Sequence, residues 1–371
     1  MTEFVYALRL IPELPDLTQK MIGVGLIGFG LAGRSFHAPV IHAVPGLRLA
    51  AIVQRSGDGA AQLYPDALIA RSVEEFLAIP DIGLVIIATP NDTHDRIARQ
   101  CLKAGRDVVV DKPLAPTFDE ARDLAKFARE RGRLLTVYHN RRFDGDFQAV
   151  QKVVAAGRLG RIVRFESNYD RFRPHLKPNA WRERTGPGTG VFMDLAPHLI
   201  DHALVLFGLP EAVAADIRVE REQGIADDSF DLTFHYANGL RALLRATMLA
   251  PVTRPRFILH GTSGAYVKHA FDGQEPKLRA GRLPWNETPS EAEQEENSGM
   301  LTLVSTDGTV TSRERLPPAQ SDYRSFYANI RDVLLGTASP AITVEHALNV
   351  MRVLEIARES SARRCTIPWP E

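Results

Sequence analysis

The first residues with a spacing that could do chemistry lie in the glycine-rich segment GLIGFGLAG, which follows an apolar run beginning at Met21. In a turn from strand to helix, a first glycine permits the tight turn and a second lets backbone N–H groups approach a pyrophosphate. A third glycine lets the helix pack closely on the sheet. The spacing predicts a dinucleotide-binding turn made of Gly28, Phe29, Gly30, Leu31, Ala32 and Gly33.

The end of the next apolar run, residues 47–53, bears on the choice of dinucleotide. NAD-binding domains usually place an acidic residue about 20 residues after the glycines, where it binds the ribose 2′-hydroxyl. Here Gln54, Arg55 and Ser56 follow instead, and the nearest acid, Asp58, lies between two glycines as a turn residue does. Arg55 could pair with a 2′-phosphate, or it could stack on adenine or face solvent. The residues favour NADP as cofactor and leave NAD possible.

A lysine in Asp111-Lys112-Pro113 directly follows a buried strand, where lysine is seldom found without a partner. It could hydrogen-bond both the nicotinamide ribose and a substrate hydroxyl, or it could form an ion pair with Asp111. The Lys-Pro bond could be cis. A second segment, ATPNDTH, follows another strand and should reach the same ligand-binding edge. From these two segments we expect cofactor contacts by Thr89, Pro90, Asn91, His94, Asp111, Lys112 and Pro113.

The elements that must position these residues alternate between strands and helices. The expected strands are nearly continuous in apolar residues, as in parallel sheets covered on both faces. Thr117 and Glu120 form a capping-box signature, and Pro39 should interrupt the helix after the glycines. The pattern predicts a doubly wound parallel sheet, with strands at 22–27, 47–53, 84–88, 108–110 and 134–138 and helices at 93–104 and 117–131.

Length and charge limit the class of protein. At roughly 150 residues per domain, 371 residues suggest two domains. With 45 Lys+Arg against 45 Asp+Glu, nothing favours nucleic acid or an anionic membrane as partner. The two cysteines, Cys101 and Cys365, are far apart, so we expect a reducing, cytoplasmic location without disulfides. Residues 1–20 make a poor signal peptide and are expected to form a tail.

Taken together, these motifs resemble the glucose–fructose oxidoreductase/inositol dehydrogenase (Gfo/Idh/MocA) family over residues 21–362. Within the family, GRSFHAP, NYDRFRP and HGTSGAYVKHAFDGQE are most similar to the NADP-dependent scyllo-inositol dehydrogenase branch. One departure is Asp111, where the family usually has glutamate. The motifs that carry the family resemblance are GLIGFGLAG, ATPNDTH, DKP, HNRRFD, WRE and GVFMDLAPHLIDHALVLFG.

The resemblance implies an N-terminal Rossmann domain over residues 21–140 and a C-terminal α/β domain over 141–371, built on an open, mostly antiparallel sheet. The final helix could pack back against the first domain, and the acidic stretch 286–297 is expected to be a solvated loop. The second domain reads as helices at 147–156, 323–335 and 344–362, strands at 162–169, 213–219, 230–236, 240–248 and 257–259, and weaker strands at 301–304 and 309–315.

The resemblance also assigns catalysis to Lys112, Asp194 and His198. Oxidising an alcohol needs a base for the hydroxyl proton, and histidine, with an unperturbed pKa of about 6.5, suits this task. A nearby carboxylate can orient the imidazole and favour its protonated form. Pro197 suggests that Asp194 lies near the helix N-cap. A metal site built from these residues with Asp201 and His202 is disfavoured, because the reaction needs no metal.

A polyol pocket would require many hydrogen-bond donors and acceptors. Whether Arg141 or Arg142 points inward stays open, and so does the possibility that the arginines form surface ion pairs. By family analogy, Trp181 and Arg182 lie against the nicotinamide half of the cofactor. The candidate substrate contacts are Asn140, Arg141, Asp170, Arg171, Arg173 and His198.

The expected activity is NADP-dependent oxidation of a cyclic polyol, with scyllo-inositol and scyllo-inosose as the leading pair. The alternatives are a sugar or dihydrodiol dehydrogenase of the same family, or a regulatory protein that senses NAD(P) without turnover. The family's open sheet usually pairs with another subunit, so a homodimer or homotetramer is expected.

Overall fold

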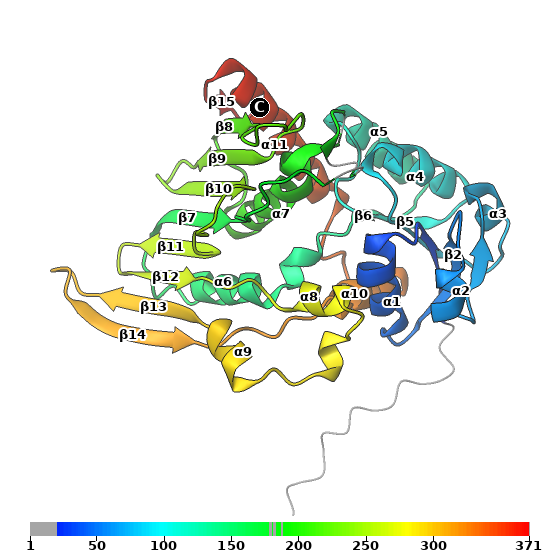
Figure 1. Cartoon of the computed structure of the whole chain (residues 1–371), viewed down its shortest axis with the longest axis horizontal. Coiled ribbons are helices and arrows are strands. Elements are labelled where there is room, and N and C mark those ends of the chain that lie inside the picture. Colours follow the sequence, from blue (N-terminus) through cyan, green and yellow to red (C-terminus); the bar gives the residue numbers. More distant parts are fainter. Residues whose placement is uncertain (1–20, 178–179, 181–182, 187, 371) are drawn as a thin grey trace, which may run out of the picture.

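A parallel β-sheet occupies the N-terminal part of the chain (Figure 1). The computed structural model describes residues 21–177, 180, 183–186 and 188–370. The strand order β3-β2-β1-β4-β5-β6 reverses between β1 and β4, and open parallel sheets bind ligands beyond the carboxyl ends of such strands. This confirms the predicted Rossmann sheet. Its strands are β1 (Ile22–Ile27), β2 (Leu47–Val53), β3 (Leu68–Ala70), β4 (Leu84–Ile87), β5 (Asp107–Val110) and β6 (Leu135–Val137).

Helices cover both faces of this sheet. On one face lie α4 (His94–Lys103) and α5 (Phe118–Glu130), and the predicted capping box of Thr117 and Glu120 is present at the start of α5. On the other face, α1 (Ala38–His42) packs beside α10 (Arg324–Leu334), which comes from the far end of the sequence. A division of the chain at residue 140 therefore separates the two sheets but not all of their helices.

The helix after the glycines does not stop at Pro39, contrary to expectation. A π-helical turn at Gly33–His37 leads into α1, and Pro39 occupies the first turn of α1. Because proline lacks the N–H that would bond to the preceding turn, it disturbs a continuous helix, and here the turn before it is π-helical. Two short helices that we did not predict, α2 (Gly59–Leu63) and α3 (Val73–Leu77), flank β3.

The C-terminal part forms a nine-stranded sheet in the order β14-β13-β12-β11-β7-β10-β9-β8-β15. Only β7 and β10 pair in parallel among these strands, so the expected open, mostly antiparallel sheet is confirmed. The predictions missed β12 and β15. The strands are β7 (Ile162–Asn168), β8 (Ala212–Arg218), β9 (Ser229–His235), β10 (Arg241–Thr247), β11 (Phe257–Gly261), β12 (Gly264–Lys268), β13 (Gly299–Val304), β14 (Val310–Leu316) and β15 (Ile367–Pro368).

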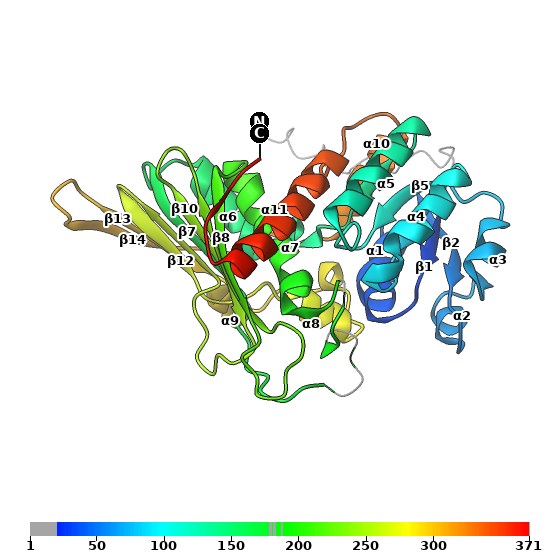
Figure 2. The same ribbon diagram turned by 90° about the horizontal axis from the view of Figure 1, so that it is seen from above.

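Three helices lie on the side of the second sheet that faces the first: α6 (Gly145–Ala155), α7 (Gly190–Phe207) and α11 (Val344–Arg363) (Figure 2). The predicted return of the last helix is confirmed, because α11 contacts α5 and β6 as well as β8. By length and composition α7 could cross a membrane, but 72% of its residues are buried inside the protein, as in the core helix of a globular fold.

The acidic stretch near residue 290 differs from the expected loop. It contains the short helix α9 (Glu291–Glu296), which begins with a capping box between Ser290 and Glu293. None of the α9 residues is buried, so this stretch is solvated as expected. The error has a local cause, since two reciprocal hydrogen bonds at the first turn can support a helix that has no apolar face.

Candidate active site

The glycine-rich turn lies between β1 and the following helix. A Cβ on Gly28 would come within 2.5 Å of the Ala88 carbonyl oxygen, and a Cβ on Gly33 within 2.0 Å of the Gly28 oxygen. Around Gly30 nothing lies within 4 Å of such an atom. Gly28, which has a φ of 105°, and Gly33 are thus required by the protein's own packing. Gly30 instead leaves open space at the helix start, where the backbone can approach a diphosphate.

The loop after β2 is held by an arginine that the sequence analysis did not single out. Arg71 donates to the Gln54 carbonyl at 3.1 Å, to the Gly57 carbonyl at 2.6 Å and to Asp58 Oδ1 at 2.9 Å. The side-chain oxygen of Gln54 accepts a hydrogen bond from the backbone N–H of Ala60 at 2.8 Å. The signal that could have identified Arg71 is its position in the chain, since it directly follows β3, the strand that pairs with β2. The neighbours of Gln54, Arg55 and Ser56, are exposed.

A buried histidine ties together the two loops at the carboxyl edge of β4 and β5. His94 has no exposed surface, and its ring nitrogens lie 2.8 Å from the Pro113 carbonyl oxygen and 2.9 Å from the Thr89 oxygen. Asn91 donates to the Gly188 carbonyl at 2.8 Å and so links the first loop to the segment before α7. These two side chains thus hold the loops together, and their contacts with a cofactor stay a prediction.

Asp111 anchors the segment that carries the lysine, in which the Lys112–Pro113 bond is cis. One Asp111 oxygen accepts the backbone N–H of Lys112 at 2.8 Å, and the other lies 3.7 Å from His37 Nε2. The opposite ring nitrogen of His37 lies 2.5 Å from the Tyr327 hydroxyl on α10. Burial raises the pKa of Asp111, but His37, Lys112 and His94 outweigh burial and lower it overall. The carboxylate is therefore held ionised behind Lys112.

The lysine side chain reaches across to α7. Lys112 Nζ donates to the Asp194 carbonyl oxygen at 2.5 Å and to Asp194 Oδ1 at 3.0 Å. Both side chains are largely buried, with 14% and 20% exposed. The sequence left open an ion pair of Lys112 with Asp111, but the structure pairs the lysine with a residue 82 positions away. The segment after β5 and helix α7 thereby bring together Lys112 and Asp194, two of the three candidate catalytic residues.

Asp194 does not lie near the helix N-cap, contrary to our expectation. The helix begins at Gly190 after Thr189, and Pro197 lies inside it. Proline has no N–H for the carbonyl four residues earlier, which belongs to Met193, and its ring crowds this turn. The adjoining carbonyl, that of Asp194, accepts the hydrogen bond from Lys112. A lysine thus supports the helix where the proline weakens it, which sequence pattern alone does not reveal.

His198 lies one turn further along α7 and is 6% exposed. Burial lowers its pKa well below the usual value, and the positive charges of Lys112 and Arg141 lower it further. Within the described part of the chain, its Nδ1 atom has no hydrogen-bond partner. The expected favouring of the protonated form by Asp194 is wrong, because that carboxylate is engaged with Lys112. The imidazole is held neutral and can accept a proton.

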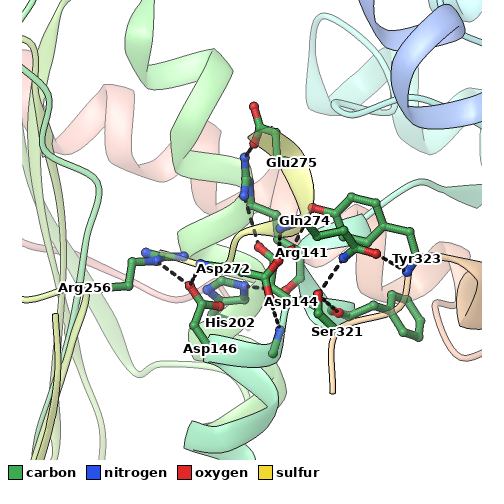
Figure 3. Close-up of polar contacts among 12 residues, drawn as sticks. Arg141, Asp144, Asp146, His202, Arg256, Asp272, Gln274, Glu275, Ser321 and Tyr323 are labelled. Carbon is green, nitrogen blue, oxygen red and sulfur yellow. Dashed lines mark hydrogen bonds and ion pairs between the residues drawn. The ribbon is translucent and has the colours of Figure 1, made fainter. Parts of the chain in front are cut away.

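Arg141, not Arg142, faces the site. Its guanidinium donates to Asp144 at 3.0 Å and to Glu275, within a buried polar network (Figure 3). The Tyr323 hydroxyl also donates to Asp144, at 2.7 Å. Arg142 turns away and forms a paired contact with Asp201 at 2.7–3.0 Å. The two neighbouring arginines thus have different partners, and the contact of Arg141 with a substrate stays a prediction.

The remaining substrate candidates are not equivalent. Asp170 is paired on both oxygens with Arg254, at 2.6 and 2.7 Å, and its contact with a substrate stays a prediction. Arg171 lies over the Tyr169 ring at 4.7 Å, and Asn140 is half-buried at the start of a short helical turn. Arg173 is exposed. The predicted contacts Trp181 and Arg182 lie outside the described residues.

The residues weighed as a metal site are dispersed among other partners. Asp201 binds Arg142 and also lies 2.8 Å from His346 Nε2, while His202 stacks on Phe147 at 3.9 Å between ring centroids. Among residues 21–370, apart from the undescribed positions, no group of three or more His, Cys, Asp or Glu side chains could hold a metal ion.

Comparison with known proteins agrees with this geometry. Residues 22–139 match the model of the oxidoreductase family with an NAD-binding Rossmann fold, and residues 147–267 match the GFO/IDH/MocA C-terminal domain. The chain thus belongs to the Gfo/Idh/MocA family of oxidoreductases.

Individual relatives are similar over nearly the whole length. The oxidoreductase YdgJ of Escherichia coli is 40% identical over 93% of this chain and 98% of its own. The NADP(+)-dependent scyllo-inositol 2-dehydrogenase IolW of Bacillus subtilis is 36% identical over 93% and 95%. The structure of the Bacillus subtilis oxidoreductase yvaA superposes with a TM-score of 0.89 at 34% identity, covering 96% of this chain and all of that one.

Proposed function

We propose that this protein is an NADP-dependent dehydrogenase that oxidises a secondary alcohol of a cyclic polyol, with scyllo-inositol as the leading substrate. The observation that carries the proposal is the junction of Lys112, Asp194 and His198 beside the glycine-rich turn. The open space at Gly30 fits a dinucleotide diphosphate. When bound, the nicotinamide supplies a hydride acceptor for alcohol oxidation and a hydride donor for the reverse reaction.

The side chains of this site divide the proton chemistry between them. His198 is neutral because burial and two nearby cations lower its pKa, so it can take the hydroxyl proton as hydride leaves the carbon. Lys112, oriented by Asp194, donates a hydrogen bond to the substrate oxygen. In the reduction direction the same positive charge stabilises the negative charge that develops on that oxygen.

The end of β2 supports NADP over NAD. None of Gln54, Arg55 and Ser56 is acidic, so none offers a carboxylate to a ribose 2′-hydroxyl. The nearest carboxylate, that of Asp58, is bonded to Arg71. Arg55 is exposed and can reach a 2′-phosphate from a loop that Arg71 holds in shape. The relative IolW is an NADP(+)-dependent enzyme, which agrees with this proposal.

Absorbance at 340 nm with NADP or NAD and a panel of inositols, aldoses and dihydrodiols tests the function. Reduction of NADP with scyllo-inositol would support it, while turnover confined to a sugar or a dihydrodiol would move the assignment to another dehydrogenase of the family. Tight cofactor binding without turnover on any panel member would favour a sensor of the cofactor instead.

We further propose a cytoplasmic homo-oligomer assembled through the outer face of the nine-stranded sheet. In Figure 2 the helices lie on only one side of this sheet. Leu243 and Ile258 both lie opposite Glu166 in the strand pairing, so the three side chains lie on the same, outer face. Glu166 forms ion pairs there with Arg164 and Arg245. Sedimentation analysis of the parent protein should show a dimer or tetramer, and Leu243→Glu should weaken the association of the subunits. A monomeric parent protein would refute the interface.

A further inference from the structure

Two arginines near the candidate catalytic residues lack neutralising partners. In the described part of the chain, neither Arg171 nor Arg173 has an acidic side chain within ion-pair distance, although Arg171 packs on the Tyr169 ring at 4.7 Å. Burial lowers the pKa of Arg173, and the charges of Arg171 and Arg279 lower it further. Phe172, between the two arginines, bridges to Leu249 in an antiparallel pairing, so the side chains of Arg171 and Arg173 leave this extended segment on the same face.

The other cations at this site are already neutralised. Lys112 pairs with Asp194 at 3.0 Å. Arg141 binds Asp144 at 3.0 Å and shares Glu275 with Arg279, which donates to that carboxylate at 2.7 Å. Figure 3 shows the contact between Arg141 and Glu275 within the buried network. Because these acids already have basic partners, the guanidiniums of Arg171 and Arg173 add positive charge to the described part of this site.

A shared aromatic ring connects the excess charge to the catalytic centre. The guanidinium of Arg141 lies 5.1 Å from the centre of the Tyr169 ring, which Arg171 also contacts. The Arg141 carbonyl oxygen lies 3.3 Å from Nε2 of His202, one turn along α7 from His198. Arg141 and the Tyr169 ring thus connect Arg171 to the helix that carries the proposed base. Guanidinium groups bind carboxylate and phosphate oxygens through paired hydrogen bonds.

We propose that Arg171 and Arg173 bind an anionic group, a carboxylate or a phosphate ester, on a substrate whose secondary alcohol is oxidised at His198. The inference rests on the proposed dehydrogenase function and changes the expected substrate from a neutral polyol to a polyol or sugar that carries an acidic or phosphorylated group. The chemistry at the reacting carbon is unchanged, since hydride leaves the carbon and the hydroxyl proton goes to His198. The cofactor's own diphosphate also carries anionic oxygens, so it is the alternative ligand for these two arginines.

Calorimetric titration of the complex with NADPH tests the inference independently of turnover. The probes are two matched pairs, an inositol with its monophosphate and an aldohexose with its uronic acid. The variants are Arg171→Ala/Arg173→Ala and, as control, Arg313→Ala. Arg313 is an exposed arginine on β14, at the far edge of the second sheet (Figure 1).

We expect the parent protein to bind the anionic member of at least one pair about 10-fold or more tightly than the neutral member, in the range of charge-assisted hydrogen bonds. The double variant should lose this preference, and Arg313→Ala should keep it. Higher salt should weaken the preference, because the guanidiniums are solvent-accessible. Equal affinities for both members of each pair, or a preference that survives in the double variant, would overturn the inference.

Separate titrations with NADPH distinguish the two sources of anionic oxygens. A loss of NADPH affinity in the double variant, with the preference between paired probes unchanged, would assign the arginines to the cofactor and overturn the inference. Failure of the dehydrogenase proposal looks different, since the anionic preference would persist without hydride transfer to any probe. Turnover of neutral polyols by a protein without that preference would instead keep the function and refute the anion site.

Discussion

Replacing Lys112 by methionine should disable the pair that it forms with Asp194. Methionine keeps much of the side-chain volume and removes both the charge and the donated hydrogen bonds at 2.5 and 3.0 Å. A charge-assisted hydrogen bond contributes roughly 1.5–3 kcal/mol, equivalent to about 10- to 150-fold. Both side chains are at most 20% exposed, so solvent screens this pair little. With the contact to substrate oxygen also lost, kcat/KM should fall about 100-fold or more.

A double-mutant cycle with Asp194→Asn tests whether the two residues act as one unit. Asparagine keeps the shape and an acceptor oxygen but removes the charge, so we expect a loss of about 10- to 150-fold in kcat/KM. If the pair is the functional unit, the double variant should be no worse than Lys112→Met alone. Losses in the double variant that multiply as for independent sites would refute this reasoning.

Two control measurements separate the loss of chemistry from a loss of folding or cofactor binding. Lys112→Met should lower Tm by only about 2 to 4 °C, the shift expected for a few kcal/mol in a chain of this size. Its affinity for NADPH should weaken less than about 10-fold, because one donor is lost from a broad contact. A large drop in Tm would mean that the lysine supports the proline-containing turn of α7 more than it supports catalysis.

Four further predictions concern the base and the cofactor. His198→Ala should reduce kcat/KM about 100- to 10,000-fold; near-parent turnover would exclude this base. Because burial, Lys112 and Arg141 lower the pKa of His198, kcat/KM for oxidation should stay level as pH falls through about 6.5 and decline only below it. Lys112→Met should move that decline to higher pH, because it removes a positive charge that lowers the pKa of His198. A parent protein already inactive at pH 6 would contradict the lowered pKa. Arg55→Ala should weaken NADP binding about 10-fold at fixed salt and spare NAD, so equal losses would mean that Arg55 only stacks on adenine. Arg71→Ala should weaken both cofactors together by loosening the loop after β2, and unchanged affinities would show that the loop holds its shape without Arg71.

Elements with strong local signals could be predicted from the amino-acid sequence. Spacing of glycines after an apolar run identifies the turn at Gly28–Gly33, because the packing requirement involves neighbouring segments of one β–α unit. The capping box at Thr117 and the apolar strands are equally local. Elements with weak local signals were missed, such as three-residue β3 and helix α9, whose first turn depends on side-chain hydrogen bonds rather than on an apolar face.

Contacts between residues far apart in the sequence became known from the folded chain alone. The pairing of Lys112 with Asp194 joins a strand end to a helix 82 residues later, and that helix passes through Pro197 where local rules place a boundary. The return of α10 onto the first sheet likewise brings Tyr327 to His37, 290 positions away. Local propensity cannot report such contacts, because their free energy arises from burial and charge pairing between segments that approach each other only in the folded chain.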